Sequence, residues 1–270
     1  MQVGQIVAIA EKEFWDRIRN RWVLAVAAVF TVFALVIAYL GAAQQGAVGF
    51  RGIDATIASL VSLVIYLVPL IALILGYDAI VGERDKGSLE LLLAMPLTRF
   101  ELLLGKYFGL ALALAFSTVA GFGLAGVMLS YRVGFDALLQ YGRFLLSALL
   151  LGWAFLSIAV LISVLAGDRI RASGIAIGLW FFYVLIYDLL LLGLLVAAEG
   201  RYSLDLFPAL LLLNPADVFR ILNVFGYEDA RQWYGLATVF PDSLASPWLM
   251  GSAMLLWIVC PLAIAIWRFR

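Results

Sequence analysis

The sequence predicts an all-α, polytopic membrane protein with six transmembrane helices. Hydrophobic residues make up 65% of its 270 residues and charged residues only 13%, whereas soluble domains are roughly half apolar and a quarter charged. Several nearly uncharged runs are also long enough to cross about 30 Å of hydrocarbon as a helix. The chain contains one Cys and no His, which excludes an internal disulfide framework, the usual zinc sites and histidine-based catalysis.

The N-terminal residues 2–21 predict an amphipathic helix that lies in the cytoplasmic interface of the membrane. Apolar residues recur there at a spacing of three to four, from Val3 to Ile18, and the charged residues fall largely on other faces. The alternative is the charged start of a signal peptide. The apolar run that follows, 22–43, is too long for a typical signal-peptide core and disfavours that alternative.

Six longer apolar runs predict the spans. Pro69 should kink the second span, small residues in the third permit close helix packing, and the fifth carries Gly174-x-x-x-Gly178. Six spans place both termini on one side, together with twelve of the eighteen Lys and Arg residues. The positive-inside rule therefore predicts cytoplasmic termini. The predicted spans are 23–42, 57–77, 102–129, 144–166, 173–197 and 248–267.

Residues 198–247 predict an outward-facing helical region between the fifth and sixth spans, which the resemblance given below implies is periplasmic. The apolar run at 206–213 is too short to cross a membrane and predicts a re-entrant or interfacial helix. The following Asn214-Pro215-Ala216-Asp217 combines an N-cap residue, a proline at the first helical position and an acidic first turn. It predicts the start of a second helix at the membrane surface. Ser246-Pro247 repeats the signal and opens the sixth span.

The loop at 78–101, between the second and third spans, is the polar centre of the chain. Charges cluster before Gly87, and residues 88–95 then predict a short apolar-rich helix. Pro96 ends this helix, because the residue before a proline is pushed out of the helical region. A capping box at 98–101 opens the next helix. We therefore predict a short lateral helix, hinged at a glycine, that another protein can push.

The chain has no P-loop for ATP. Gly105-Lys106 is preceded by Phe100 where that motif has glycine, and is followed by Tyr107 where it has Ser or Thr. We therefore expect no catalytic residue and no cofactor in this chain. If ATP drives it, ATP and Mg²⁺ bind to a separate subunit on the cytoplasmic face.

Two acidic residues lie within or beside the spans. Asp188 falls inside the fifth span, where a charge costs about 2.5–3.5 kcal/mol. It serves either as a gate or proton site, or as a structural group bonded to a neighbouring Tyr, Ser or backbone atom, and we favour the structural role. Asp78 ends the second span, where we expect a solvated interfacial charge.

Sulfur-containing side chains could bind soft metal ions such as Cu(I). The chain offers Cys260 and five Met residues, of which Met250 and Met254 share one face of the sixth span. These residues form no ladder of ligands across the membrane. We therefore expect packing roles and no metal site.

The stretch at 78–106 resembles the signature of ABC-2-type transporter permeases. With the N-terminal helix and the six spans, this resemblance covers the whole chain. Within that family, residues 55–60, 73–82 and 214–220 resemble the permease subunits that serve maturation of nitrous oxide reductase. Lys86 departs from the family, which often has a second acidic residue there. This difference weakens one expected contact but leaves the glycine hinge at Gly87 in place. The signature residues are Gly82-Glu83-Arg84, Gly87-Ser88-Leu89-Glu90, Leu91–Leu93, Pro96, Arg99 and Leu103-Leu104-Gly105-Lys106.

The resemblance implies that residues 1–270 form a single transmembrane domain in a bacterial inner membrane. It implies a second copy of the chain, two cytoplasmic ABC ATPase subunits, a periplasmic accessory protein and membrane lipids as partners, with no nucleic acid. The lateral helix at 88–95 would be the coupling helix, seated in a groove of the ATPase. The residues expected to couple to the ATPase are Glu83, Arg84, Asp85, Gly87, Ser88, Leu89, Glu90, Leu91, Leu92, Pro96 and Arg99. Those expected to dock the periplasmic protein are Asn214, Pro215, Asp217, Phe219 and Arg220.

Three functions fit these expectations. The first is a mechanical permease, in which the ATPase moves the coupling helix and spans 2 and 5 relay the movement to copper-site (Cu–S) assembly of nitrous oxide reductase. The second is an ABC-2 exporter that moves a lipid, a drug, another amphiphile, or a sulfur or copper species between two protomers. The third is an intramembrane enzyme or proton channel that uses Asp188 and Asp78, which the sparse intramembrane polar residues disfavour.

Overall fold

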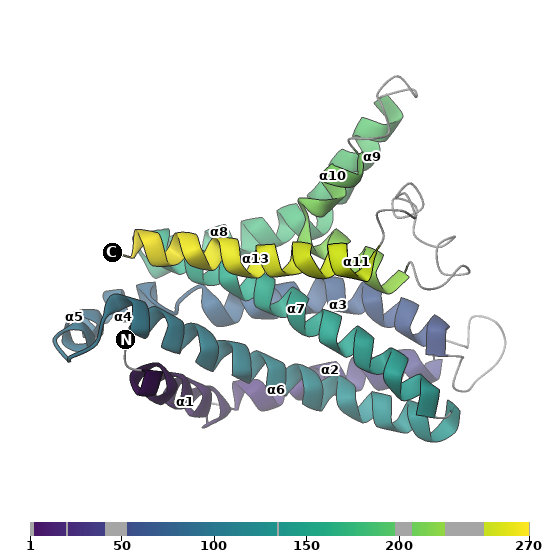
Figure 1. Cartoon of the computed structure of the whole chain (residues 1–270), viewed down its shortest axis with the longest axis horizontal. Coiled ribbons are helices and arrows are strands. Elements are labelled where there is room, and N and C mark those ends of the chain that lie inside the picture. The colour runs from purple at the N-terminus through teal and green to yellow at the C-terminus, as the bar shows by residue number, and fades with distance from the viewer. Residues whose placement is uncertain are drawn as a thin grey trace.

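Every regular element that the computed structural model describes is a helix, which confirms the all-α class (Figure 1). The described residues are 3–19, 21–40, 53–133, 135–197, 207–224 and 246–269.

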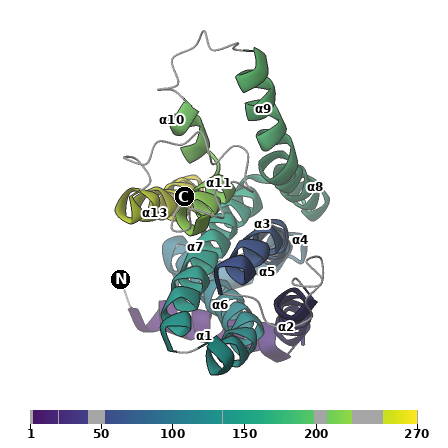
Figure 2. The same cartoon turned by 90° about the vertical axis from the view of Figure 1, so that its right-hand side faces the viewer.

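Six long helices build the bundle, and they are α1 (Val3–Arg19), α2 (Trp22–Leu40), α3 (Ile53–Gly76), α6 (Arg99–Val133), α7 (Phe135–Leu165) and α13 (Pro247–Arg268). The helices α6 and α7 pack against each other at the centre. Both α1 and α2 pack on α6, whereas α3 and α13 pack on α7. Figures 1 and 2 show α1, α2 and α6 on one side of α7 and α13 on the other.

Five stretches of the described chain are long and apolar enough to cross a membrane, and a sixth is counted if α1 and α2, which meet at 63°, are one broken span. The chain is therefore a multi-pass membrane protein, as predicted. In the most apolar part of α7, 72% of the residues are buried, against 11% in Arg169–Ala197. The fifth predicted span thus lies at the periphery of the bundle, and α7 lies at the centre of the bundle. The five stretches are Ile57–Asp85, Arg99–Val127, Leu138–Leu165, Arg169–Ala197 and Pro247–Arg268.

Glycines on α6 let the two N-terminal helices approach it closely. A Cβ atom built on Gly109 would lie 2.6 Å from the carbonyl oxygen of Ala10 in α1. One built on Gly121 would lie 2.4 Å from the Cβ atom of Phe30 in α2. No larger residue fits at either position, which confirms the prediction that small residues in the third span permit close packing.

Four buried phenylalanines connect α2, α6, α7 and a short helix, α11 (Pro215–Val224), through ring contacts. The ring centroids of Phe30 and Phe122 lie 4.8 Å apart, those of Phe122 and Phe144 6.0 Å, and those of Phe144 and Phe219 6.3 Å. Aromatic pairs at these separations stabilise a core beyond the area they bury. The row therefore anchors α11 in the bundle.

The fifth predicted span is present but interrupted. It consists of α8 (Arg169–Phe181), a π-helical turn η2 (Phe182–Ile186) and α9 (Tyr187–Ala197). In a π-helical turn, the N–H of residue i donates to the carbonyl of residue i−5 and not to that of residue i−4, and such turns occur often at functional sites. In Figure 1, α8 lies along the bundle and α9 projects away from it.

Two short helices lie within the region predicted at 198–247. They are α10 (Phe207–Leu212) and α11, which begins at Pro215 as the capping signal predicted. The side-chain oxygen of Asn214 accepts a hydrogen bond from the backbone N–H of Ala216 at 3.0 Å. Residues 198–206 and 225–245 lie outside the described residues, so a re-entrant course stays a prediction.

Three predicted boundaries are corrected. The third and fourth spans, predicted at 102–129 and 144–166, extend to Val133 and back to Phe135 as α6 and α7. Residues 130–133 and 135–143, which lie between the two predicted spans, therefore belong to helices. The short lateral helix ends at Leu93, two residues earlier than predicted.

Candidate functional site

The loop between α3 and α6 holds two short helices, α4 (Val81–Asp85) and α5 (Ser88–Leu93), at the same end of the molecule as both chain termini (Figure 1). Gly87 turns the chain between them with a φ of 71°, which favours glycine over other residues. Beyond α5, the Thr98 hydroxyl accepts from the Glu101 N–H at 3.2 Å, and the Glu101 carboxylate accepts from the Thr98 N–H at 2.9 Å. The predicted capping box is therefore confirmed.

The helix α5 has an inner and an outer face. Leu89, Leu92 and Leu93 are half-buried and pack against the core. Leu91 is 73% exposed, and Met95, just beyond the helix, is 56% exposed. A partner that approaches this end of the bundle can therefore contact Leu91 and Met95 directly, whereas the inner leucines hold α5 in place.

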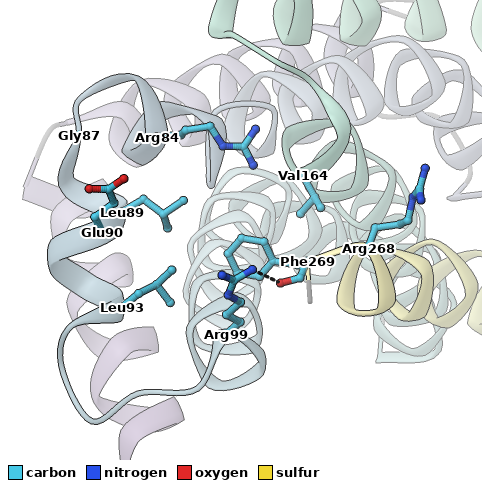
Figure 3. A pocket seen from close by; sticks show the side chains of 9 residues that line it. All are labelled: Arg84, Gly87, Leu89, Glu90, Leu93, Arg99, Val164, Arg268 and Phe269. Carbon is cyan, nitrogen blue, oxygen red and sulfur yellow. Dashed lines mark hydrogen bonds between the residues drawn. The ribbon is translucent and has the colours of Figure 1, made fainter.

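A cavity of about 490 Å³ lies between α5 and the adjoining ends of α6, α7 and α13. Figure 3 shows Leu89 and Leu93 pointing into it from α5. Across the cavity, the Arg99 guanidinium donates to the carbonyl of Phe269 at 3.5 Å and lies 5.9 Å from the Phe269 ring. A space open to solvent therefore separates part of α5 from the ends of α6, α7 and α13.

Lys106 of α6 connects α1 and α4 through two carboxylates. Its ammonium group lies 2.9 Å from the Glu83 carboxylate and 3.2 Å from that of Glu13, and only 8% of its side chain is exposed. Ser88, the first residue of α5, donates to the carbonyl of Glu83 at 3.2 Å and to its carboxylate. Because a buried charge is costly unless paired, this inner triad of Glu13, Lys106 and Glu83 fastens α5 to the N-terminal helix.

Arg169, at the start of α8, joins the loop to the fifth span. Its guanidinium lies 2.8 Å from the Asp78 carboxylate, and its backbone N–H donates to the Asp85 carboxylate at 3.0 Å. Arg17 of α1 lies 3.8 Å from Asp78 on another side. Asp78 stays partly exposed, at 21% of its side chain, and two helices distant in sequence bring basic groups to it. These groups line a second, polar cavity of about 340 Å³.

A serine of α7 caps the start of α4. The Ser163 hydroxyl is fully buried and accepts hydrogen bonds from the N–H groups of Ile80 at 2.9 Å and Val81 at 3.1 Å. Ile80 has no side chain that could cap the helix itself, so α7 satisfies two amides that the turn after α3 exposes. The Arg84 guanidinium also donates a hydrogen bond to the carbonyl of Ala166, just after α7, at 2.9 Å, which is a further link between α4 and α7.

The predicted coupling residues all lie at this one end of the bundle, but they differ in role. Glu83, Asp85 and Ser88 take part in the ionic contacts above, and Arg84 and Arg99 bond the ends of α7 and α13. Glu90 and Leu91 are exposed. The carbonyl of Pro96 accepts a hydrogen bond from the Gln5 side chain of α1 at 2.9 Å. Their role in ATPase coupling stays a prediction.

A second polar cluster, the outer triad of Asp188, Arg220 and Asp217, joins the fifth span to α11. The Arg220 guanidinium lies 2.8 Å from the Asp188 carboxylate and 2.5 Å from that of Asp217. Asn214 donates to the Asp217 carboxylate and to the carbonyl of Tyr183 in the π-helical turn, both at 2.9 Å. The bonded partner of Asp188 is thus a basic residue and not the expected Tyr, Ser or backbone atom.

Most of the residues predicted to dock a periplasmic protein are buried within this chain. Asn214, Pro215, Asp217 and Phe219 are all buried, and Arg220 is half-buried. They hold α11 against the bundle through the outer triad and the row of phenylalanines. Docking at this region stays a prediction, and these side chains are already occupied by internal contacts.

Sequence reasoning missed the basic and acidic partners that come from distant helices. Glu13 and Arg17 are separated by one helical turn, and their 3.0 Å ion pair marks the face of α1 that meets the loop. The cost of a charge inside a span demands a basic partner for Asp188, and this signal could have identified Arg220. Nothing in the sequence marks Ser163 as the cap of α4, because a buried serine on a spanning helix usually bonds a carbonyl of its own helix.

Comparisons with known proteins give the family. The family described as ABC-2 family transporter protein matches residues 7–270. A protein from Stutzerimonas stutzeri described as "Probable ABC transporter permease protein NosY" is 44% identical over 272 residues, which cover 99% of each chain. A protein from Pseudomonas aeruginosa with the same description is 47% identical over 268 residues, which cover 97% of this chain and 96% of the relative. The chain therefore belongs to the ABC-2 family of ABC transporter permeases.

Proposed function

We propose that this permease is the membrane part of a complex in which separate ABC ATPase subunits bind α5 on the cytoplasmic side. The observation that carries the proposal is α5 itself. It is a short helix at the end of the bundle, with Leu91 and Met95 exposed and a cavity of about 490 Å³ behind it. A groove of the ATPase that encloses the exposed face can push α5 into that space.

Two sets of ionic contacts connect α5 to the rest of the bundle. Ser88 bonds Glu83, which Lys106 links to Glu13 of α1. Asp85, just before the glycine hinge, bonds the first residue of α8. Movement of α5 therefore acts on the N-terminal helix and on the fifth span, which supports mechanical transmission through that span.

The fifth span continues toward the other end of the bundle, where Asp188 bonds Arg220 of α11. A force applied at Arg169 can thus reach α11 through one interrupted helix. We propose that α11 and the region around it pass this movement to a periplasmic accessory protein. The exposed apolar face of the fifth span, with Gly174 and Gly178 open to neighbours, supports a second copy of the chain as partner.

The event served on the periplasmic side is, in this proposal, copper-site assembly of nitrous oxide reductase. Two relatives of nearly full length share the permease description. The stretches at 55–60, 73–82 and 214–220 carry the resemblance to permeases of that maturation system. The complex acts either by mechanical transmission alone or by transport of a sulfur or copper species.

The exposed face of α5 offers a direct test. Leu91→Asp places a charge on the outer face without disturbing the core, so we expect co-purification of the ABC ATPase subunits and permease-dependent ATP hydrolysis to fall strongly. Leu213→Asp is the matched control, because Leu213 is 57% exposed between α10 and α11 and lies outside the candidate spans. Equal ATPase recovery from both variants and the wild type would refute binding at α5.

A further inference from the structure

The outer triad contains two carboxylates and one guanidinium. Asp217 is 1% exposed, Arg220 15% and Asp188 28%, measured on the side chains. If both carboxylates are ionised, a net negative charge remains in a largely apolar surrounding. Burying an uncompensated charge is among the most costly arrangements in a protein, and such groups usually become neutral instead.

One oxygen of the triad has no hydrogen-bond partner in the described structure. It is the Oδ1 atom of Asp188, which is buried although its Oδ2 atom bonds Arg220. A buried polar atom of this kind calls for an explanation. An ionised carboxylate can only accept hydrogen bonds, whereas a protonated one also donates, so a proton on the pair changes what these oxygens can bond.

Few other ionisable groups belong to the helices that pack against α11. Tyr187 of α9 interacts with both carboxylates, and its hydroxyl donates to the carbonyl of Leu210 in α10 at 2.6 Å. On α7, the neutral Ser147 bonds Asn223 of α11. The remaining ionisable residues of the neighbouring elements are Tyr183 in η2, Asp54 and Tyr66 in α3, Asp136, Tyr141 and Arg143 in α7, and Cys260 and Arg268 in α13.

We propose that Asp217 binds one exchangeable proton beside the Asp188 carboxylate, and that this proton holds α11 closed against the π-helical turn. Two carboxyl groups that share a site retain a proton because like charges disfavour ionisation of the second group. With the proton bound, one carboxylate balances Arg220 and the triad is neutral. Without it, the repulsion between Asp188 and Asp217 acts between the fifth span and α11.

Asp217 lies on α11, outside the spanning helices, and the direction of its pKa shift supports this assignment. Burial raises the pKa of the Asp217 carboxyl to about 7, Arg220 opposes the rise, and Asp188 adds to it. A raised pKa means that the closed form binds more protons than an open form near pH 4–7, so closure weakens as the pH rises through that window. Above the pKa, occupancy of the proton site falls about tenfold per pH unit.

The proposal is tested on the full permease in lipid nanodiscs by infrared difference spectroscopy between mildly acidic and mildly alkaline pH. We expect a protonated-carboxyl band in the wild type that is lost as the pH rises through neutrality. Asp217→Asn and Asp188→Asn should each remove this transition. Asp168→Asn is the control, because Asp168 is a partly exposed helix cap and should leave the band unchanged.

A second readout is the thermal midpoint of unfolding as a function of pH. In the wild type we expect it to fall as the pH rises from about 4 to about 7 and to level off above that, and in Asp217→Asn we expect this fall to be lost. If the wild type shows no carboxyl band that either variant removes, both carboxylates are ionised and the proton site does not exist. That result would leave ATPase binding at α5 untouched, so the two proposals fail separately.

Discussion

The two ends of the bundle hold the same kind of ionic group in different surroundings. At the end that carries α5, Lys106 lies between Glu13 and Glu83, and at the other cluster Arg220 lies between Asp188 and Asp217. The inner triad has further basic groups close by, since Arg17 pairs with Glu13 at 3.0 Å. In the outer triad, one carboxylate is 1% exposed and the other has an oxygen without a partner.

This difference shows what surroundings do to one chemical arrangement. With a further base close by, as Arg17 is to Glu13, an acid–base–acid group can exchange partners, which suits a joint that moves. Where one carboxylate is 1% exposed, as Asp217 is, the same group is restrained, because every broken contact leaves a buried charge unpaired. The inner triad therefore suits a joint next to α5 that can shift, and the outer triad suits a firm attachment through which the fifth span carries α11 with it.

Loss of the outer base should have the largest effect on stability. Arg220→Met leaves two carboxylates without their basic partner, and breaking a buried pair in this way costs about 3–5 kcal/mol. Unfolding by denaturant in detergent micelles measures this loss. The triple variant Asp188→Asn, Asp217→Asn, Arg220→Met removes all three charges, so we expect most of the stability to return. If the triple variant is as unstable as Arg220→Met, the cost is one of packing and not of charge.

Loss of the inner base should destabilise the chain less. Lys106→Met removes the base that Glu13 and Glu83 share, but Glu83 is 23% exposed and Arg17 still pairs with Glu13. We expect a loss of roughly 2–3 kcal/mol, below the range for fully buried pairs, and greater access of protease to α1. Lys106→Arg, which keeps the charge, is the control. A cost equal to that of Arg220→Met would contradict the contrast between the triads.

The serine that caps α4 should contribute less again. Ser163→Ala leaves the buried N–H groups of Ile80 and Val81 without an acceptor, which costs about 1–3 kcal/mol. Ser117 is the matched control, because its buried hydroxyl donates to the carbonyl of Ala113 in its own helix. Thermal unfolding of both alanine variants compares them. Equal midpoints would show that Ser163 does not hold the loop to α7.

The glycine hinge should have the smallest effect on folding. Gly87→Ala places a side chain at a φ of 71°, which costs about 1–2 kcal/mol, and a Cβ there meets no atom within 4 Å. The expected consequence is a shift of α5. This shift lowers the rate of permease-dependent ATP hydrolysis, while the protein stays folded. Gly87→Asn, which tolerates this conformation, should retain more of that activity. If the alanine and asparagine variants hydrolyse ATP at the same rate, the backbone conformation at Gly87 does not control this activity.

The sequence was sufficient for features that depend on local patterns and insufficient for those that depend on distant partners. The capping box at 98–101, the glycine turn at Gly87 and the cap at Asn214 each depend on a few neighbouring residues, and all were predicted. The pairing of Asp188 with Arg220 spans 32 positions in sequence, and no periodicity encodes it. The π-helical turn at Phe182–Ile186 contains no proline that would mark it in the sequence, and its contact with Asn214 comes from a distant part of the chain.

Site-specific cross-linking between α5 and the ABC ATPase measures the central claim most directly. Replacing Cys260, the single cysteine, by serine gives a background into which one cysteine is introduced. In membranes that contain the whole complex, Leu91→Cys should cross-link to the ATPase subunit, and Leu213→Cys should not. The account is contradicted if Leu91→Cys gives no cross-link to the ATPase while a membrane-impermeant thiol reagent labels it from the periplasmic side.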